Sequence, residues 1–366
     1  MQYSICRTKN TNYFFSNIPY EIIMNNRIVW VDWIKVIGIY IIVLGHFPLE
    51  NSWLKPFIFS FHVPVFFIIS GYLYKSCVTL SSSWKKNIQT LLVPYLCISF
   101  IIIFYNFLRF YSHHSSGFQE SIIFLIKQTS AILLGLNNNS WKSLEGVGGP
   151  IWYIYVLFFI RLLFDKMRHR NAHTIVCILF LITNYFLCSF NINYPFSILN
   201  IFLSYPFFTI GYNIRNHHFK TFEKSRIFLT KHPIINFCFI IISGFITYYI
   251  SYYFNGIAYM YNHAFGNNLL LFYISALFGS ICIFALCQYV SSFRVNMIEI
   301  LSNGTVLIVG LHIILINYSN YIIDLTSILQ SILLALVYTL LFYYPIIITS
   351  KLCPWVLGKK TKKSTA

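Results

Sequence analysis

The apolar segment from residue 28 to residue 47 carries two basic groups that such segments rarely hold, Lys35 and His46. They lie eleven residues apart, which on an α-helix is close to three full turns and about 16 Å along the axis. Both side chains are therefore expected on one face. There the lysine would hold an anion, and the imidazole would accept a proton near neutral pH. Asp32 precedes Lys35 by three residues, a spacing at which the two can pair.

Each of these two residues also has a structural explanation. Lys35 can extend its side chain to the cytoplasmic interface, and His46 can form a hydrogen bond with a neighbouring helix. Ionisable groups inside membrane segments are nevertheless costly, and a site is the default hypothesis for them. A cation near one end of the segment and an imidazole deeper inside it together favour that hypothesis.

Further candidate site residues share a position in or next to later apolar segments. They are His62, Ser70 and Gly71 in the second segment, Lys85 and Lys86 before the third, Trp152 and Tyr153 at the start of the fourth, and His312 in the ninth. The structural alternatives are helix packing for the two histidines and the Ser-Gly pair, and topological charge for the lysines. For the Trp-Tyr pair the alternative is an aromatic belt at the membrane surface.

The composition indicates lipid as the main solvent of the chain that carries these residues. Of its 366 residues, 57% are hydrophobic and only 10% charged, against about 25% charged in soluble domains. A membrane-spanning helix needs about 20 mostly apolar residues. We therefore expect an all-α, polytopic transmembrane bundle of about ten spans, at residues 28–47, 53–74, 88–110, 150–165, 173–190, 196–214, 233–254, 268–290, 303–323 and 327–350. Residues 120–136 are shorter and carry Lys127, and they are expected to be interfacial or re-entrant.

The distribution of Lys and Arg predicts the direction of the bundle. With the N-terminus on the cytoplasmic side, most of the 26 bases fall in cytoplasmic segments. The outer side holds only Lys55, Arg109, Lys127 and Lys142. This pattern predicts a multi-pass protein of the cell (cytoplasmic or inner) membrane with both termini in the cytoplasm. Residues 1–27 would form a cytoplasmic extension, 28–350 the transmembrane domain and 351–366 a basic tail.

Several other classes of protein are disfavoured. The net charge of +17 is spread over short loops, whereas nucleic-acid binding needs a contiguous basic surface on a water-soluble element. The nine cysteines contain no CxxC pair, so neither a disulfide framework nor a metal site is expected. The scarcity of acids near the middle of the spans disfavours an ion-coupled transporter. No Ser/His/Asp or Cys/His arrangement is evident, which favours direct transfer over a covalent intermediate.

Five stretches resemble the membrane-bound acyltransferase 3 family, particularly its members similar to fucose O-acetylases. They are VDWIKVIGIYIIVLGH, FSFHVPVFFIISGYLYK, KKNIQTLLVPY, GPIWYIYVLFFI and LSNGTVLIVGLH. The resemblance implies that His46 matches the essential histidine of the family, that Lys35 takes the place of an arginine, and that Ser70-Gly71 matches its SG pair. The chain departs from the family where Arg-x-x-Arg is usual, because Lys86 is followed three residues later by Gln89.

The residues and the resemblance together predict an integral membrane O-acyltransferase. It would move an acetyl group from cytoplasmic acetyl-CoA, or another acyl group from its CoA ester, to a sugar hydroxyl of a glycan or lipid-linked sugar. His46 would act as general base, and Lys35, Lys85 and Lys86 would bind the donor, with no permanently bound cofactor. The alternative is an exporter of a lipid-linked glycan or polysaccharide.

Overall fold

The computed structural model describes residues 27–49, 52–76, 79–113, 118–136, 141, 144, 146–147, 149–167, 170–188, 190, 194–319 and 327–359. Across these ranges the protein is helical, and the only β-type pairing is an isolated bridge between Trp141 and Leu144. The all-α prediction is therefore confirmed for this part of the chain.

Each of the ten predicted apolar segments falls on one helix or on two consecutive helices. The elements in chain order are α2 (Val29–Gly45), α3 (Leu54–Tyr72), α4 (Leu80–Asn87), η1 (Ile88–Leu92), α5 (Val93–His113), α6 (Phe118–Leu133), α7 (Trp152–Lys166), α8 (Arg170–Cys188), η2 (Pro195–Ser197), α9 (Ile198–Asn216), α10 (Phe219–Lys231), α11 (Pro233–Tyr249), η3 (Ile250–Asn255), η4 (Met260–Asn262), α12 (Leu269–Val290), α13 (Asn296–Asn303), α14 (Thr305–Ser319), α15 (Ile328–Leu341), α16 (Tyr343–Leu352) and η5 (Pro354–Leu357).

Five of the described helices are long and apolar enough to cross a membrane by themselves. They span Leu54–Tyr72, Leu80–Ser112, Pro233–Asn255, Leu269–Val290 and Ile328–Leu352. A sixth results if α13 and α14, which meet at 80°, count as one broken span. The protein is thus a multi-helix membrane protein.

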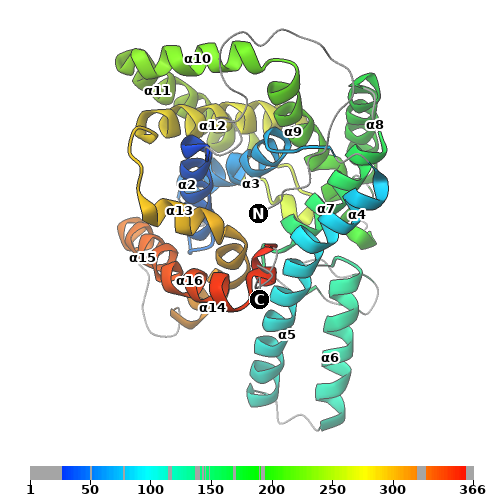
Figure 1. Cartoon of the computed structure of the whole chain (residues 1–366). Helices are drawn as coiled ribbons and strands as arrows, with labels where there is room; N and C mark the ends of the chain where they lie inside the picture. The colour runs from blue at the N-terminus through cyan, green and yellow to red at the C-terminus, as the bar shows by residue number, and fades with distance from the viewer. Residues whose placement is uncertain are drawn as a thin grey trace, which may run out of the picture.

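Helices α2 and α3 lie in the middle of the helix assembly (Figure 1). Around α2 pack α12, α13, α14 and α15, and around α3 pack α9, α11 and α12. The segment 120–136, expected to be interfacial or re-entrant, corresponds mostly to α6, which forms a hairpin with α5 at one side of the molecule (Figure 1). The rings of Phe110 and Phe124 stack across this hairpin at 4.5 Å.

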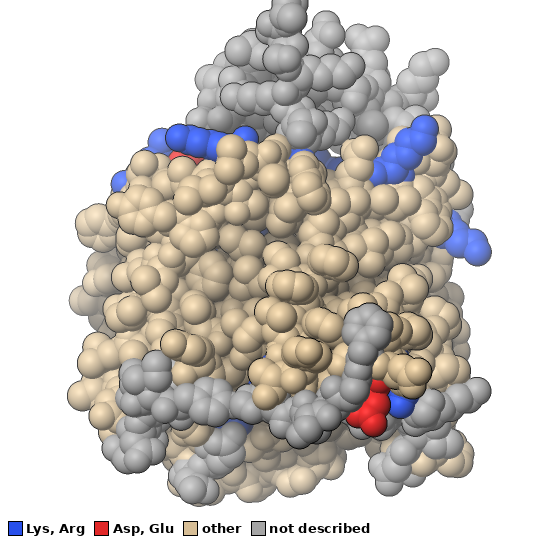
Figure 2. Space-filling view, turned by 90° about the horizontal axis from the view of Figure 1, so that it is seen from below, with Lys and Arg blue, Asp and Glu red and all other residues tan. Residues whose placement is uncertain are grey.

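The outer surface has the charge distribution expected of a membrane protein. Figure 2 shows a broad face without Lys, Arg, Asp or Glu, with basic side chains along its upper rim. Elsewhere on the surface, α11 exposes large apolar side chains that water would not favour, among them Phe237, Phe245 and Ile242, which are 58%, 61% and 58% exposed. Lipid is the solvent that such a face requires.

Two glycines allow α3 and α9 to approach closely. A Cβ atom on Gly71 would overlap the carbonyl oxygen of Phe208, and one on Gly211 would overlap that of Ile68. Small residues at such crossings let helix backbones come together where no hydrophobic effect drives association. Gly71 therefore lies at a close crossing of α3 and α9, as the packing alternative expects, and its role in shaping the site stays a prediction.

Replacing Gly71 by Ala is expected to destabilise the protein, because the added methyl group must push two backbones apart. Overpacking of this kind costs about 1–3 kcal/mol. The thermal midpoint of the detergent-purified variant should fall. The matched control is Gly244→Ala on α11, where the new methyl group would meet Cys282 at an ordinary 3.5 Å. Equal midpoints for the two variants would contradict the assignment.

Candidate active site

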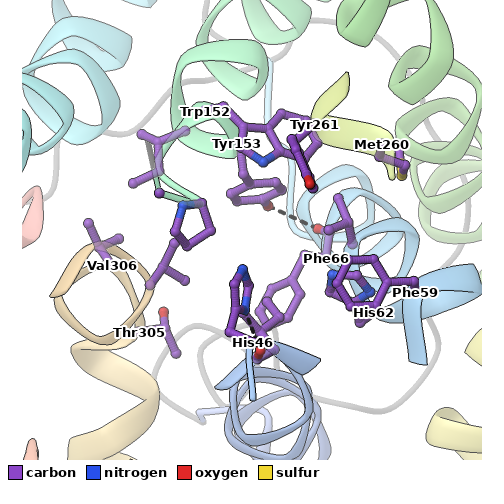
Figure 3. A pocket seen from close by; sticks show the side chains of 16 residues that line it. His46, Phe59, His62, Phe66, Trp152, Tyr153, Met260, Tyr261, Thr305 and Val306 are labelled. Atoms are coloured by element: carbon purple, nitrogen blue, oxygen red, sulfur yellow. Dashed lines mark hydrogen bonds between the residues drawn. The ribbon is translucent and has the colours of Figure 1, made fainter. Parts of the chain in front are cut away.

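A cavity of about 70 Å³ lies where α2, α3, α7 and α14 meet the segment around η4 (Figure 3). Its walls are mostly aromatic and aliphatic, with two imidazoles and three hydroxyls among them. The lining residues are Ile42, His46, Phe59, His62, Val63, Phe66, Gly149, Pro150, Trp152, Tyr153, Ile154, Met260, Tyr261, Thr305, Val306 and Val309. An apolar pocket with a few convergent polar groups is the usual form of a small-molecule site.

His46 stands at the end of α2 with its ring directed into this cavity (Figure 3). The helix ends here because Pro48 cannot continue it and restricts the residue before it. His46 Nδ1 lies 2.7 Å from the Ile42 carbonyl oxygen. Since a carbonyl oxygen only accepts, Nδ1 must carry the hydrogen in this arrangement. The neutral ring then leaves Nε2 as a proton acceptor.

His312 lies directly behind His46. It is fully buried, and its Nδ1 is 2.8 Å from the Ile308 carbonyl oxygen, so its Nε2 is also an acceptor in the neutral ring. That Nε2 lies 3.4 Å from His46 Nδ1, and the two rings meet edge to face at 4.9 Å. His312 therefore offers a second acceptor to the Nδ1 hydrogen of His46. Of the two roles open for His312, helix contact or site, the structure shows a contact that supports the site.

His62 is the second imidazole of the cavity. It is 6% exposed, and its Nδ1 lies 2.9 Å from the carbonyl oxygen of Ile58. Its ring packs edge to face on Phe59 at 4.8 Å. His62 thus presents a bare Nε2 to the same space as His46, and it is a lining residue as well as a packing one.

Trp152 and Tyr153 form the opposite wall. Trp152 is 3% exposed, so an aromatic belt at the membrane surface is the wrong explanation for it. The Tyr153 hydroxyl lies 2.7 Å from Ser70 Oγ and 3.2 Å from the Phe66 carbonyl oxygen (Figure 3). The serine of the Ser70-Gly71 pair therefore acts on the site through Tyr153.

Asp32 makes its ion pair with a different partner from the one expected. Arg27 Nε lies 2.5 Å from Asp32 Oδ2, and Ser302 Oγ lies 2.5 Å from Asp32 Oδ1. Arg27 also contacts Glu299 Oε1 at 2.7 Å. Asp32 is still within electrostatic reach of Lys35, but its direct ion pair is with Arg27, whose guanidinium reaches both carboxylates at once.

Lys35 lies toward the Arg27 end of α2, and it is not among the residues that line the His46 cavity. It is within electrostatic reach of Arg27, Arg161 and Lys359 as well as Asp32. Burial and the neighbouring Arg27 lower the pKa of Lys359. Four bases thus gather near one end of the bundle, an environment that favours an anion.

A second, polar pocket of about 170 Å³ lies at this end, between α4, α7 and the segment after α3. Lys86 lines it together with Arg161 and Asp165, whereas Lys85 does not, although both lysines are exposed. Adjacent residues on a helix point about 100° apart, which separates the two lysines. The buried Asp165 accepts hydrogen bonds from Tyr74, Ser83 and Asn87.

Helices α3 and α7 connect the two pockets. On α7, Tyr153 lines the His46 cavity and Arg161 lines the polar pocket, eight residues or about 12 Å further along. On α3, Phe59 and Phe66 line the first, and Leu73 follows into the second. The imidazole site and the basic site therefore lie at opposite ends of one helix pair.

Several residues of the two pockets were missed in the sequence. Thr305 and Tyr261 line the imidazole cavity, and Arg161 and Asp165 line the polar one. For the last two a signal existed, since Arg161 is a base inside a predicted span and Asp165 follows it by one helical turn. Thr305 and Tyr261 have no comparable signal. In the described ranges no three His, Cys, Asp or Glu side chains are grouped so that they could hold a metal ion.

Comparison with known proteins agrees with this arrangement. A family model described as an acyltransferase domain, that of the acyltransferase 3 family, matches residues 28–351. The chain therefore belongs to this family. Nodulation protein NolL of Sinorhizobium fredii (strain NBRC 101917 / NGR234) is 36% identical over 86 residues, which cover 20% of this chain and 23% of NolL. The chain thus matches less than a quarter of that relative. No solved structure matches it.

Replacing Asp165 by Ala should destabilise the polar pocket, because three side-chain donors lose a common acceptor. Donors left unsatisfied in a buried place cost about 1–3 kcal/mol each, so a loss of about 3 kcal/mol is expected. The thermal midpoint of the purified protein measures it. Asp165→Asn retains one acceptor oxygen and should lose less. An Ala variant as stable as the wild type would show that the network is unimportant.

Proposed function

We propose that the protein is an O-acyltransferase that moves an acetyl group from acetyl-CoA to a sugar hydroxyl of an exported or cell-surface glycan, or of a lipid-linked precursor. The observation that carries the proposal is the His46 imidazole, held through Nδ1 with Nε2 open to an apolar cavity. Membership of the acyltransferase 3 family supports the reaction class. The donor, the acceptor and the roles of individual residues are the proposed part.

The bundle would cross the membrane about ten times, with both termini in the cytoplasm. The polar pocket and the bases around Lys35 then face the cytoplasm, where CoA esters are made. The His46 cavity lies toward the outer half. This orientation is supported by the distribution of Lys and Arg along the sequence, which is asymmetric in almost every loop.

The donor would bind with its phosphates at the basic end. Lys86 and Arg161 line the polar pocket there, and Lys35 and Lys359 lie in the same electrostatic environment. Arginine and lysine side chains are the groups that bind phosphate best in proteins. The exposed Lys85 would attract the donor at longer range. The pantetheine arm would then follow α3 and α7 toward His46, a path of about 12 Å along α7.

The chemical step would be a direct transfer. His46 Nε2 takes the proton of the acceptor hydroxyl while the hydroxyl oxygen attacks the acyl carbon. The carbon–sulfur bond then breaks, and the proton passes from His46 to the departing thiolate, which leaves as CoA. General base catalysis of this kind contributes about 10²–10⁴-fold. His62 supplies a second bare Nε2 in the same cavity and would orient the acceptor.

Stabilisation of the oxyanion would come from the start of α14. Thr305 and Val306 line the cavity and form the first turn of this helix, whose backbone N–H groups lack intrahelical partners. The positive end of the helix dipole is therefore directed at the place where negative charge develops. The small volume of about 70 Å³ suits an acetyl group better than a long acyl chain.

Replacing His46 by Ala should remove O-acetyl groups from the surface glycan of cells that depend on this protein. Removal of a general base predicts a loss of about 10²–10⁴-fold in transfer rate. Mass spectrometry of the purified glycan measures the acetylation. The control is His232→Ala, which removes an exposed imidazole far from the cavity.

The amount of glycan separates this function from export. An acyltransferase variant keeps its polymer and loses only the decoration, whereas loss of the polymer itself would indicate an exporter. Full acetylation in His46→Ala cells would refute the proposed reaction.

His312 is proposed as a positioning residue, because it contacts His46 and does not line the cavity. His312→Leu should lower kcat about tenfold, corresponding to one hydrogen bond, and leave KM for acetyl-CoA unchanged. His312→Gln retains an acceptor for His46 Nδ1 and should recover much of the rate. A steady-state assay of both variants tests this. A parallel rise in KM, or no recovery with Gln, would indicate a merely structural role.

A further inference from the structure

A second cavity, of about 300 Å³, lies away from His46, between α3, α9, α10, α11 and α12. This volume is at the lower end of the range of small-molecule pockets. The walls are apolar over most of their length, with Leu277, Ile281 and Phe284 of α12 along one side. Phe239 and Ile281, which line it, are also 49% and 42% exposed on the outer surface of the bundle. The cavity therefore opens sideways, toward the hydrocarbon.

The side chain of Gln288 indicates that this cavity holds a polar group as well as a chain. Gln288 lines the cavity and is only 4% exposed. Neither its Nε2 nor its Oε1 has a hydrogen-bond partner in the described part of the protein. Buried amides are almost always bonded, and leaving both atoms unsatisfied is costly. A ligand carbonyl that accepts from Nε2 removes the part of this cost that belongs to the donor.

The dimensions of the cavity fit one leaflet of a bilayer. Leu277 and Gln288 lie eleven residues apart on α12, or about 16 Å along the axis. Half of a hydrocarbon core of about 30 Å is about 15 Å. A chain that extends from Gln288 to Leu277 therefore covers the depth of one leaflet, with the amide at the level where ester carbonyls of lipids lie.

Helix α10 provides the polar end of the cavity. Phe222, Ser225, Arg226 and Leu229 share one helical face and line it. Arg226 is held by Glu223 at 2.8 Å. The remaining surface of α10 carries Lys220, Lys224 and Lys231 beside the exposed Phe228. A short helix with basic and apolar faces lies in the membrane interface and attracts anionic lipids.

The geometry points to a binding site for an anionic phospholipid, formed by α9, α10, α11 and α12. One acyl chain fills the cavity from Gln288 to Leu277, its ester carbonyl accepts from Gln288 Nε2, and its phosphate lies at α10 beside Arg226. The site is separate from the acyl-transfer cavity, and it rests on none of the residues proposed for catalysis.

Native mass spectrometry of the full-length protein in detergent tests this site, with added phosphatidylglycerol or phosphatidylcholine of identical chains. Wild type should retain phosphatidylglycerol about tenfold more than phosphatidylcholine, as expected for a charge-assisted contact. Arg226→Gln should abolish this preference. Leu277→Trp should reduce bound lipid about tenfold by filling the cavity. Its matched control is Ile242→Trp, which adds the same ring on the exposed face of α11 outside the cavity.

A thermal measurement keeps the test decisive if the Trp variant folds poorly. Gln288→Leu removes the unsatisfied amide, so the lipid-free variant should melt no lower than wild type, and phosphatidylglycerol should raise its midpoint less. The proposal is overturned if wild type retains no phospholipid, if Leu277→Trp and Ile242→Trp retain equal amounts, or if Gln288→Leu keeps the full lipid-induced shift. None of these readouts depends on acyl transfer.

Discussion

The contact between His46 Nδ1 and the carbonyl oxygen of Ile42 is the constraint on which the candidate active site depends. His46 makes this contact at the C-terminal end of α2 by turning its ring back onto its own helix. With Nδ1 committed to a carbonyl, the neutral ring presents Nε2 to the cavity. His312, brought in by α14 after its 80° bend from α13, reinforces the same orientation from behind. Together, the end of one helix and the bend between two others aim a proton acceptor at a single space.

The same local contact recurs at three histidines, and their surroundings decide what each can do. His46, His62 and His312 all place Nδ1 against the carbonyl oxygen four residues earlier. A polar ring in a membrane helix must satisfy its donor, and this contact does so without a partner helix. The other ring nitrogen is then available. It faces the cavity at His46 and His62, whereas at His312 it faces His46. The residue type alone therefore does not distinguish a general base from a histidine that positions it.

The features that depend on a single apolar segment could be predicted from the sequence. Lipid requires long apolar helices, so the helices were located closely, and His46 was identified because an imidazole is costly in such a segment. Contacts between segments that lie far apart in the sequence could not be predicted. Arg27 pairs with Glu299, 272 positions away, and also with Asp32, so the direct ion pair of Asp32 is with Arg27 and not with Lys35. The register of α4 separated Lys86 from Lys85, and close packing with α9 explained Gly71. Thr305 lines the cavity because of the bend between α13 and α14, and the sequence alone did not predict this bend.

The tautomer of His46 is the most direct test of the account. The measurement is the ¹⁵N NMR spectrum of the ¹⁵N-histidine-labelled protein near neutral pH, with the His46 signals assigned from a His46→Gln variant. A neutral ring protonated at Nδ1, with the chemical shift of an unprotonated nitrogen at Nε2, is the predicted result. A ring protonated at Nε2, whether neutral or doubly protonated, would leave His46 without an acceptor facing the cavity and would contradict its proposed role.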